Sequence, residues 1–177
     1  MIVDAYTDGS AVVAGKHKGR GGFGVYFPLL NGEPKAYSLG FWFAKTGQME
    51  VMALKYAIMA MPRELDTPVQ LNVYSDSEYV VKSFTENRLE KWIANGWKNS
   101  SGVVKNLELW KDIVELLDER SKYLNINLIH IRSHQVEKAK TKEDKDRLMK
   151  DPHVIGNMKA DMLADYKRHQ FFELKVK

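Results

Sequence analysis

The chain has 177 residues, a length that suits one domain with a sizeable core. Its hydrophobic content of 44% and charged content of 28% are those of an ordinary globular protein. No apolar stretch approaches the roughly 20 residues that a membrane-spanning helix needs, and the absence of cysteine excludes disulfides and thiolate metal sites. The formal net charge of +4 suits a polyanionic partner but does not by itself indicate one.

The N-terminal part of the chain predicts three strands followed by a helix. Apolar runs at residues 2–7, 23–30 and 35–44 are separated by segments that contain glycine, a pattern typical of an antiparallel meander. From Met49 onward the apolar residues recur at helical spacing, and Pro62 marks the end of that helix.

The rest of the chain alternates strands with helices. Residues 69–74 and 124–132 predict strands, while helices are predicted around residues 80–84, over 103–117 as the longest helix, and over 158–169. A meander followed by such crossovers indicates an α/β fold in which helices pack on a mixed sheet.

Two segments, 88–102 and 136–154, break the regular pattern of the single domain that we expect over residues 1–177. Residues 137–151 carry six Lys or Arg and five Asp or Glu, so this stretch is strongly polar but almost neutral. Such a composition is typical of a mobile flap or a short exposed helix, and we expect 136–154 to be a mobile polar loop.

Four carboxylates lie where predicted elements change direction. Asp8 ends the first strand, Glu50 opens the first helix, Asp76 closes the fourth strand, and Asp161 lies in the first turns of the last helix. Each alone has an ordinary explanation, because Asp is common in turns and Glu favours the first turn of a helix. Together they supply the oxygen ligands that Mg²⁺ prefers, and two ions about 4 Å apart can promote phosphoryl transfer.

These acids belong to an ordered set of short motifs that covers nearly the whole chain. The motifs are Thr7-Asp8-Gly9-Ser10, Gly21-Gly22-Phe23-Gly24, Met49-Glu50 with Ala53, Asp76-Ser77 with Tyr79-Val80, Asn95-Gly96-Trp97-Lys98, Val104-Lys105-Asn106 with Leu109-Trp110, Ser133-His134, and Asn157 with Ala160-Asp161 and Leu163-Ala164. In this order they resemble the type 1 ribonucleases H. The resemblance implies a ribonuclease H-like fold, with three antiparallel strands, two parallel strands and helices on both faces of the sheet. It also implies endonucleolytic cleavage of the RNA strand of RNA–DNA hybrids, leaving 3′-hydroxyl and 5′-phosphate ends.

The resemblance further implies roles for individual residues. Asp8 would bridge two Mg²⁺ ions, for which Mn²⁺ is a possible substitute. Asp161 would help hold the ion that activates the attacking water, and Glu50 and Asp76 would hold the ion on the leaving-group side. His134 matches a histidine that handles the leaving group or product, although a surface-loop histidine is the plain alternative. The remaining histidines receive no role; they are His17, His130, His153 and His169.

Contacts with nucleic acid are also expected from the resemblance. Residues 88–102 correspond to a protruding handle that grips the DNA strand, although its tryptophans could instead pack the handle onto the body. Lysines and an arginine of the glycine loop could contact phosphates or belong to a solvated turn. The expected contact residues are Gly9, Ser10, Lys16, Lys18, Arg20, Thr46, Gln48, Ser77, Trp92, Trp97, Lys98, Lys105 and Asn157.

The sequence departs from the family pattern in four places. Thr46-Gly47-Gln48 stands where two Asn are common, and Glu78 where Gln is frequent. The handle has Ile93-Ala94 where lysines are common, and the 136–154 connection is considerably longer than usual. The altered residues before Glu50 bear on selectivity for RNA, because that selectivity depends on contacts with the 2′-hydroxyl.

Two other functions remain open from the sequence. One is a DNA nuclease of the same fold, such as a junction resolvase or recombinase core. The other is a non-catalytic module that binds hybrids. For the leading ribonuclease H function we expect a monomer without membrane association, located in the cytoplasm of a bacterium or, for a viral enzyme, of the host.

Overall fold

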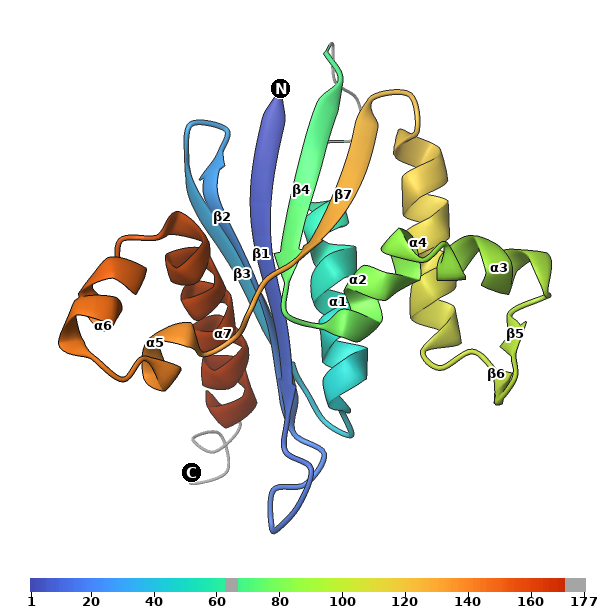
Figure 1. Ribbon diagram of the computed structural model, residues 1–177. Helices are drawn as coiled ribbons and strands as arrows, with labels where there is room; N and C mark the ends of the chain where they lie inside the picture. Colours follow the sequence, from blue (N-terminus) through green and yellow to red (C-terminus); the bar gives the residue numbers. More distant parts are fainter. Residues whose placement is uncertain (63–66, 171–177) are drawn as a thin grey trace.

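The computed structural model describes residues 1–62 and 67–170. Within them, a five-stranded sheet has the order β3-β2-β1-β4-β7 (Figure 1). The first three strands pair antiparallel, and β4 and β7 continue the sheet in parallel with β1. The strands are β1 (Ile2–Ala11), β2 (Gly21–Leu30), β3 (Glu33–Phe41), β4 (Val69–Ser75) and β7 (Leu124–His130). This topology confirms the predicted fold class.

Helices cover both faces of the sheet. The long helix α7 (Pro152–Gln170) packs across β1, β2 and β3 on one face, and α1 (Thr46–Met59) packs on β1 and β2 from the other (Figure 1). Helix α4 (Leu107–Arg120) lies against α1, and Lys55 of α1 forms an ion pair with Asp112 of α4 at 2.6 Å. No helix in the described ranges is both long and apolar enough to cross a membrane.

The alternation of side chains along β2 explains how two helices reach opposite faces of one sheet. Phe23 and Val25 are fully buried in the core that includes α1. Gly22 and Gly24 point the other way, because successive strand residues face opposite sides. A Cβ atom on Gly24 would overlap the backbone carbonyl of Ala160 in α7. Glycine is therefore required here for α7 to lie directly on the strands.

A long connection joins β4 to α4, and part of it protrudes from the body. It contains α2 (Glu78–Thr85), α3 (Arg88–Ala94) and a small hairpin of β5 (Lys98–Asn99) and β6 (Gly102–Val103). Figure 1 shows α3 and this hairpin projecting away from the sheet beside α4. Segment 88–102 therefore has the protruding form expected of a handle.

The last helix begins earlier than the apolar spacing predicts. Helix α7 starts at Pro152, and the side chain of Asp151 accepts a hydrogen bond from the backbone N–H of His153 at 2.8 Å. Proline at the first helical position after a capping Asp is a strong start signal. Asp161 consequently lies well inside the helix rather than in its first turns. Gly156 is also helical and packs against the ring of Tyr6.

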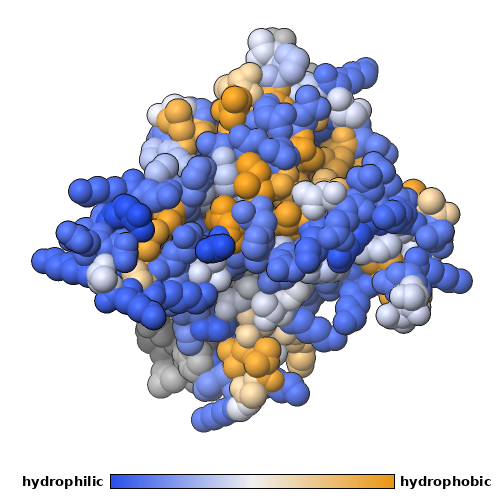
Figure 2. Space-filling view, in the orientation of Figure 1, coloured by the Kyte–Doolittle hydropathy of each residue, from blue (hydrophilic) through white to orange (hydrophobic). Residues whose placement is uncertain are grey.

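Two further expectations about elements were wrong. Helix α7, with 19 residues, is longer than α4, with 14, and Val103 belongs to β6 rather than to the α4 stripe. Segment 136–154 is not a loop, because most of it forms α5 (Gln135–Lys138), α6 (Lys142–Leu148) and the start of α7. Helix α6, which has no buried residues, is the short exposed helix that the composition also allowed. Figure 2 shows mostly hydrophilic residues over α5 and α6. The mobility of this segment remains a prediction.

Candidate active site

Asp8 and Asp76 are brought together by parallel strands. Thr7 of β1 pairs with Ser75, the last residue of β4, so the next residues are Asp8 and Asp76. The carboxyl ends of parallel neighbours meet at the same edge of a sheet, which is the usual location of sites in α/β proteins. The first two acids of the site therefore follow directly from strand register.

Glu50 joins them because α1 lies directly against β1. A Cβ atom on Gly9 would overlap the backbone of Met49 and Glu50, so only glycine permits this approach. The side chain of Glu50 is then fixed by Ser77, whose hydroxyl donates a hydrogen bond to Oε2 at 2.6 Å. The same Ser77 hydroxyl caps α2 by accepting from the backbone N–H of Val80 at 3.4 Å.

Asp161 comes from the opposite face of the sheet. Its neighbour Ala160 is fully buried against β2, which anchors this turn of α7. Asp161 lines a small cavity of about 60 Å³ together with His134 and Asn157. The buried Oδ1 of Asn157 has no hydrogen-bond partner among the described residues. This cavity therefore adds a free oxygen acceptor beside Asp161.

The four carboxylates influence one another electrostatically. Burial raises the pKa of Asp8 to about 7, and repulsion by Asp76, Asp161 and Glu50 adds to this rise. Burial also raises the pKa of Glu50, although the hydrogen bond from Ser77 opposes the shift. The pKa of Asp76 is raised by burial and by Asp161, while His134 and Ser133 lower it. Close like charges of this kind favour protonation or the binding of cations.

The donor set fits hard divalent cations. All four side chains are carboxylates, which are the ligands that Mg²⁺ prefers, and Asp8 interacts with each of the other three. Among the described residues, no group of three or more His, Cys, Asp or Glu is already gathered closely enough to hold a metal ion. The carboxylates of Asp76, Asp161 and Glu50 nevertheless all act on Asp8, so the four acids, all within the described ranges, share one end of the sheet without forming a closed ligand shell.

His134 lies at the edge of this cluster. Its φ of 53° places it in the left-handed region, immediately before α5. The side chain is exposed, and Nδ1 lies 3.0 Å from Oε2 of Glu137. It shares the small cavity with Asp161 and interacts electrostatically with Asp76. The predicted histidine is therefore beside the acids, held by a partner that sequence reasoning missed.

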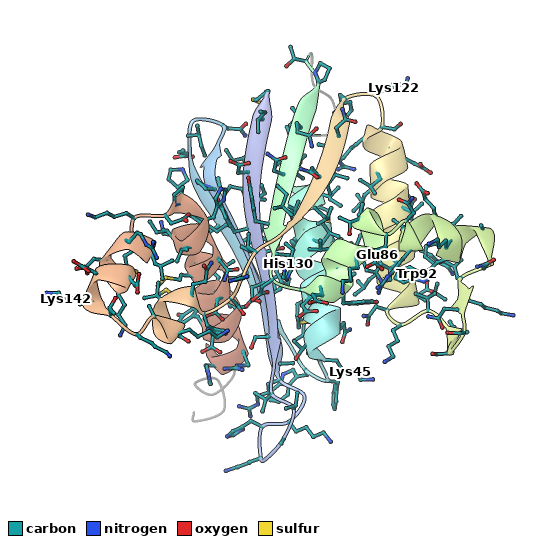
Figure 3. All side chains as sticks on the ribbon, viewed as in Figure 1. Lys45, Glu86, Trp92, Lys122, His130 and Lys142 are labelled. Carbon is teal, nitrogen blue, oxygen red and sulfur yellow. The ribbon has the colours of Figure 1, made fainter. Side chains whose placement is uncertain are left out.

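Burial corrects part of the expected set of nucleic-acid contacts. Trp92 is only 8% exposed and packs against Trp110, with 5.6 Å between ring centroids, so it joins α3 to the core instead of stacking on a sugar (Figure 3). Arg20 is buried with its guanidinium 4.7 Å from the centroid of the Trp42 ring, so it does not face a phosphate. The other buried members of the set are Gly9, Ser77 and Asn157. The members that are partly or fully exposed are Ser10, Lys16, Lys18, Thr46, Gln48, Trp97, Lys98 and Lys105.

A pocket beside Glu50 contains residues that sequence reasoning did not place in the site. It has a volume of about 570 Å³ and is lined by Lys45, Gly47, Gln48, Glu50, Tyr79, Lys105 and Asn106. Tyr79 organises its wall, because its hydroxyl donates to the carbonyl of Lys105 at 3.0 Å and accepts from Nε1 of Trp110 at 2.8 Å. Asn106 lies at this pocket immediately before α4, and its φ is positive. The pocket brings two lysines next to the Glu50 carboxylate.

Comparisons with known proteins identify the family of the chain. A model of the RNase H family matches residues 2–168. The chain belongs to the RNase H family. Ribonuclease H of Acetivibrio thermocellus is 35% identical over 144 residues, which are 81% of this chain and 90% of that protein. The resemblance inferred from the motifs is confirmed, and the chain is a ribonuclease H.

Solved structures show the same fold. The solution structure of the PFV RNase H domain matches this ribonuclease H with a TM-score of 0.67 and 26% identity, covering 94% of this chain and 93% of that one. The crystal structure of LC11-RNase H1 in complex with RNA/DNA hybrid matches with a TM-score of 0.55 and 19% identity. It covers 97% of this chain and 99% of that one, and it supports the fold assignment.

We expect Asp8→Asn to stabilise this ribonuclease H in the absence of divalent cations. The folded-state pKa of Asp8, about 7, exceeds its ordinary value of 3.8. The cost of ionising Asp8 is therefore absent at low pH, grows between these two values, and is fully present above pH 7. Thermal and urea unfolding in EDTA should show a gain of up to about 4 kcal/mol near pH 8 and almost none near pH 4.

Asp4→Asn is the matched control for this experiment. Asp4 lies on the same strand but accepts a hydrogen bond from Asn72 at 2.9 Å, so its removal should not stabilise the protein. A loss of stability in Asp8→Asn near pH 8, or an equal gain near pH 4, would contradict electrostatic repulsion at the site.

We expect Ser77→Ala to weaken the response to divalent cations, because Glu50 loses the hydroxyl that orients it. Loss of such a supporting hydrogen bond typically reduces metal affinity or activity about 10- to 100-fold. The measurement is activity as a function of Mg²⁺ concentration. Thr141→Ala serves as the control, because Thr141 caps α6 in the same way but touches none of the four acids. Equal Mg²⁺ responses in the two variants would remove Ser77 from the site.

Proposed function

We propose that this ribonuclease H cleaves the RNA strand of RNA–DNA hybrids at the cluster of Asp8, Glu50, Asp76 and Asp161. The observation that carries the proposal is the convergence of these acids from β1, α1, the end of β4 and α7. Family membership supports it, as do solved relatives described in complex with RNA/DNA hybrid. A non-catalytic hybrid-binding module is disfavoured because the acid set is complete.

Two Mg²⁺ ions, or Mn²⁺ in their place, would supply Lewis-acid stabilisation of the attacking and leaving oxygens during in-line displacement. Asp8 occupies the central position, since it interacts with all three other acids. Asp161 lies on the α7 side, whereas Ser77 fixes Glu50 on the side of Asp76 and α1. Water attack on phosphorus with departure of the ribose 3′ oxygen would leave 3′-hydroxyl and 5′-phosphate ends.

The pocket beside Glu50 is suited to the nucleic-acid backbone near the cleavage site. Lys45 and Lys105 flank it and can neutralise a phosphate, while Gln48 can donate a hydrogen bond. Figure 3 shows Lys45 at the lower end of α1, on the side of the sheet where the protrusion lies. Trp97 and Lys98 extend this surface along the protrusion, where both remain at least partly accessible.

His134 is placed to assist at the end of the reaction. It lies beside Asp161 and Asp76, and its contact with Glu137, 3.0 Å from Nδ1 to Oε2, can hold the ring near the departing oxygen. The left-handed backbone at His134 sets the direction in which the chain enters α5. We assign His134 a role in proton transfer to the leaving group or in product release.

The direct test compares cleavage of matched RNA–DNA hybrid, double-stranded RNA and double-stranded DNA with Mg²⁺ or Mn²⁺. We expect cleavage of the hybrid alone, and a loss of kcat of at least about 100-fold in Asp76→Asn. Cleavage of double-stranded DNA at a comparable rate would favour the resolvase-like alternative. Full activity in Asp76→Asn would remove this carboxylate from the reaction.

A further inference from the structure

A second pocket adjoins the candidate active site on the side of Asp76. Its volume is about 650 Å³, and it lies between the chain that follows β7 and helices α5 and α6. One wall carries Asp76 and residues 130–133, and the other is built by the α5–α6 insertion. The long connection thus shares a cavity with a catalytic carboxylate.

In the folded structure, the basic and acidic side chains of the α5–α6 insertion are distributed unevenly around this pocket. In sequence, residues 137–151 are nearly neutral, with six basic and five acidic side chains. In the structure, Lys138, Lys140 and Arg147 line the pocket, and Asp144 is the insertion acid that lines it with them. The cations therefore face the pocket in excess, although the segment as a whole carries almost no charge.

The pocket retains positive charge after its internal ion pairs are counted. Asp144 accepts from Arg147 at 3.0 Å and from the hydroxyl of Thr141 at 2.8 Å, so these groups partly satisfy one another. Lys138 donates to the backbone carbonyl of Ser133 at 3.3 Å. Among the described residues, neither Lys138 nor Lys140 forms an ion pair with a carboxylate. Two lysines remain able to contact an anion.

The lining suits a nucleotide better than an isolated ion. Besides the cations, it includes the apolar side chains of Ile131, Ala139 and Leu148, which can contact a sugar or base. Phosphate groups pair with lysine, and the unpaired faces of bases or sugars rest on apolar surface. Asp76 at the border makes the cavity continuous with the site of cleavage.

We propose that the α5–α6 insertion forms an additional substrate subsite, in which Lys138 and Lys140 bind a backbone phosphate of the nucleic-acid strand that passes Asp76. This inference rests on the proposed function, since it extends the same substrate beyond the cleaved bond. The subsite supplies phosphate contacts on the opposite side of the acids from the pocket of Lys45 and Lys105. It lengthens the substrate footprint without contributing to the chemical step.

The test uses two double variants that remove the same charge from the same insertion. Lys138→Gln/Lys140→Gln alters the pocket, whereas Lys142→Gln/Lys145→Gln alters lysines of α6 that do not line it. Figure 3 shows Lys142 at the outer edge of α6, pointing away from the body. Circular dichroism and thermal melting are used to check that both variants fold like the wild type.

We measure binding of a fluorescent RNA–DNA hybrid across a series of salt concentrations, together with steady-state cleavage. For Lys138→Gln/Lys140→Gln we expect binding to weaken about 5- to 10-fold and the salt slope to fall by about one per phosphate contact. KM should rise by a similar factor with kcat changed less than about twofold. For Lys142→Gln/Lys145→Gln we expect less than about a twofold change in binding.

Equal weakening of hybrid binding in both double variants would overturn the subsite, because it would show that only the overall charge of the insertion affects binding. Unchanged binding and KM in Lys138→Gln/Lys140→Gln would overturn it as well, and would leave the basic pocket to a different kind of partner. Failure of the proposed function is distinguishable. In that case the wild type binds the hybrid without cleaving it, while the comparison of the two variants in binding still decides the subsite.

Discussion

The site depends on the close approach of two helices to the central strands. Gly9 allows α1 to touch β1, and Gly24 allows α7 to touch β2. A side chain at either position would meet helix backbone, which cannot move aside as a flexible side chain can. These contacts bring Glu50 and Asp161 from opposite faces of the sheet to the end where Asp8 and Asp76 lie. The close packing of helix backbone on strand backbone therefore brings the four acids together, although their charges repel one another.

Assembly by packing forces like charges together, and this has a functional consequence. Burial and mutual repulsion raise the pKa of Asp8 to about 7, so the apo site is under electrostatic strain. Divalent cations relieve such strain and thereby couple folding stability to metal binding. The surrounding structure limits this electrostatic strain through Ser77, whose hydroxyl orients Glu50 and also caps α2. The four carboxylates therefore lower the stability of the fold locally, at the site where function requires their charge.

The sequence was sufficient to predict the strands in chain order and the fold class, whereas the metal-binding role of the four acids stays a prediction. Apolar runs define β1 and β4, and the parallel pairing of these strands in the structure puts Asp8 beside Asp76. The start of α7 was missed because Asp151-Pro152 lies within a polar stretch that lacks apolar periodicity. Trp92 was misassigned because an aromatic residue in a protrusion can face either a ligand or the core. Only its contact with Trp110 decides between them.

Charge distribution was the least predictable property. A nearly neutral run of alternating acids and bases says nothing about which side chains will share a cavity. The grouping of Lys138, Lys140 and Arg147 beside Asp76 follows from the directions of α5 and α6, which are tertiary features. Likewise, the pocket of Lys45 and Lys105 depends on the meeting of the starts of α1 and α4.

The most direct measurement of the central claim is the binding of Mn²⁺, followed by electron paramagnetic resonance of the free ion. If the four acids form one cation site, single replacement of Asp8, Glu50, Asp76 or Asp161 by its amide should weaken binding about 10- to 100-fold. Asp4→Asn, on the same strand as Asp8, should bind like the wild type. Binding of Mn²⁺ that is unchanged in the Glu50→Gln and Asp161→Asn variants would show that the two helices do not contribute to a shared site.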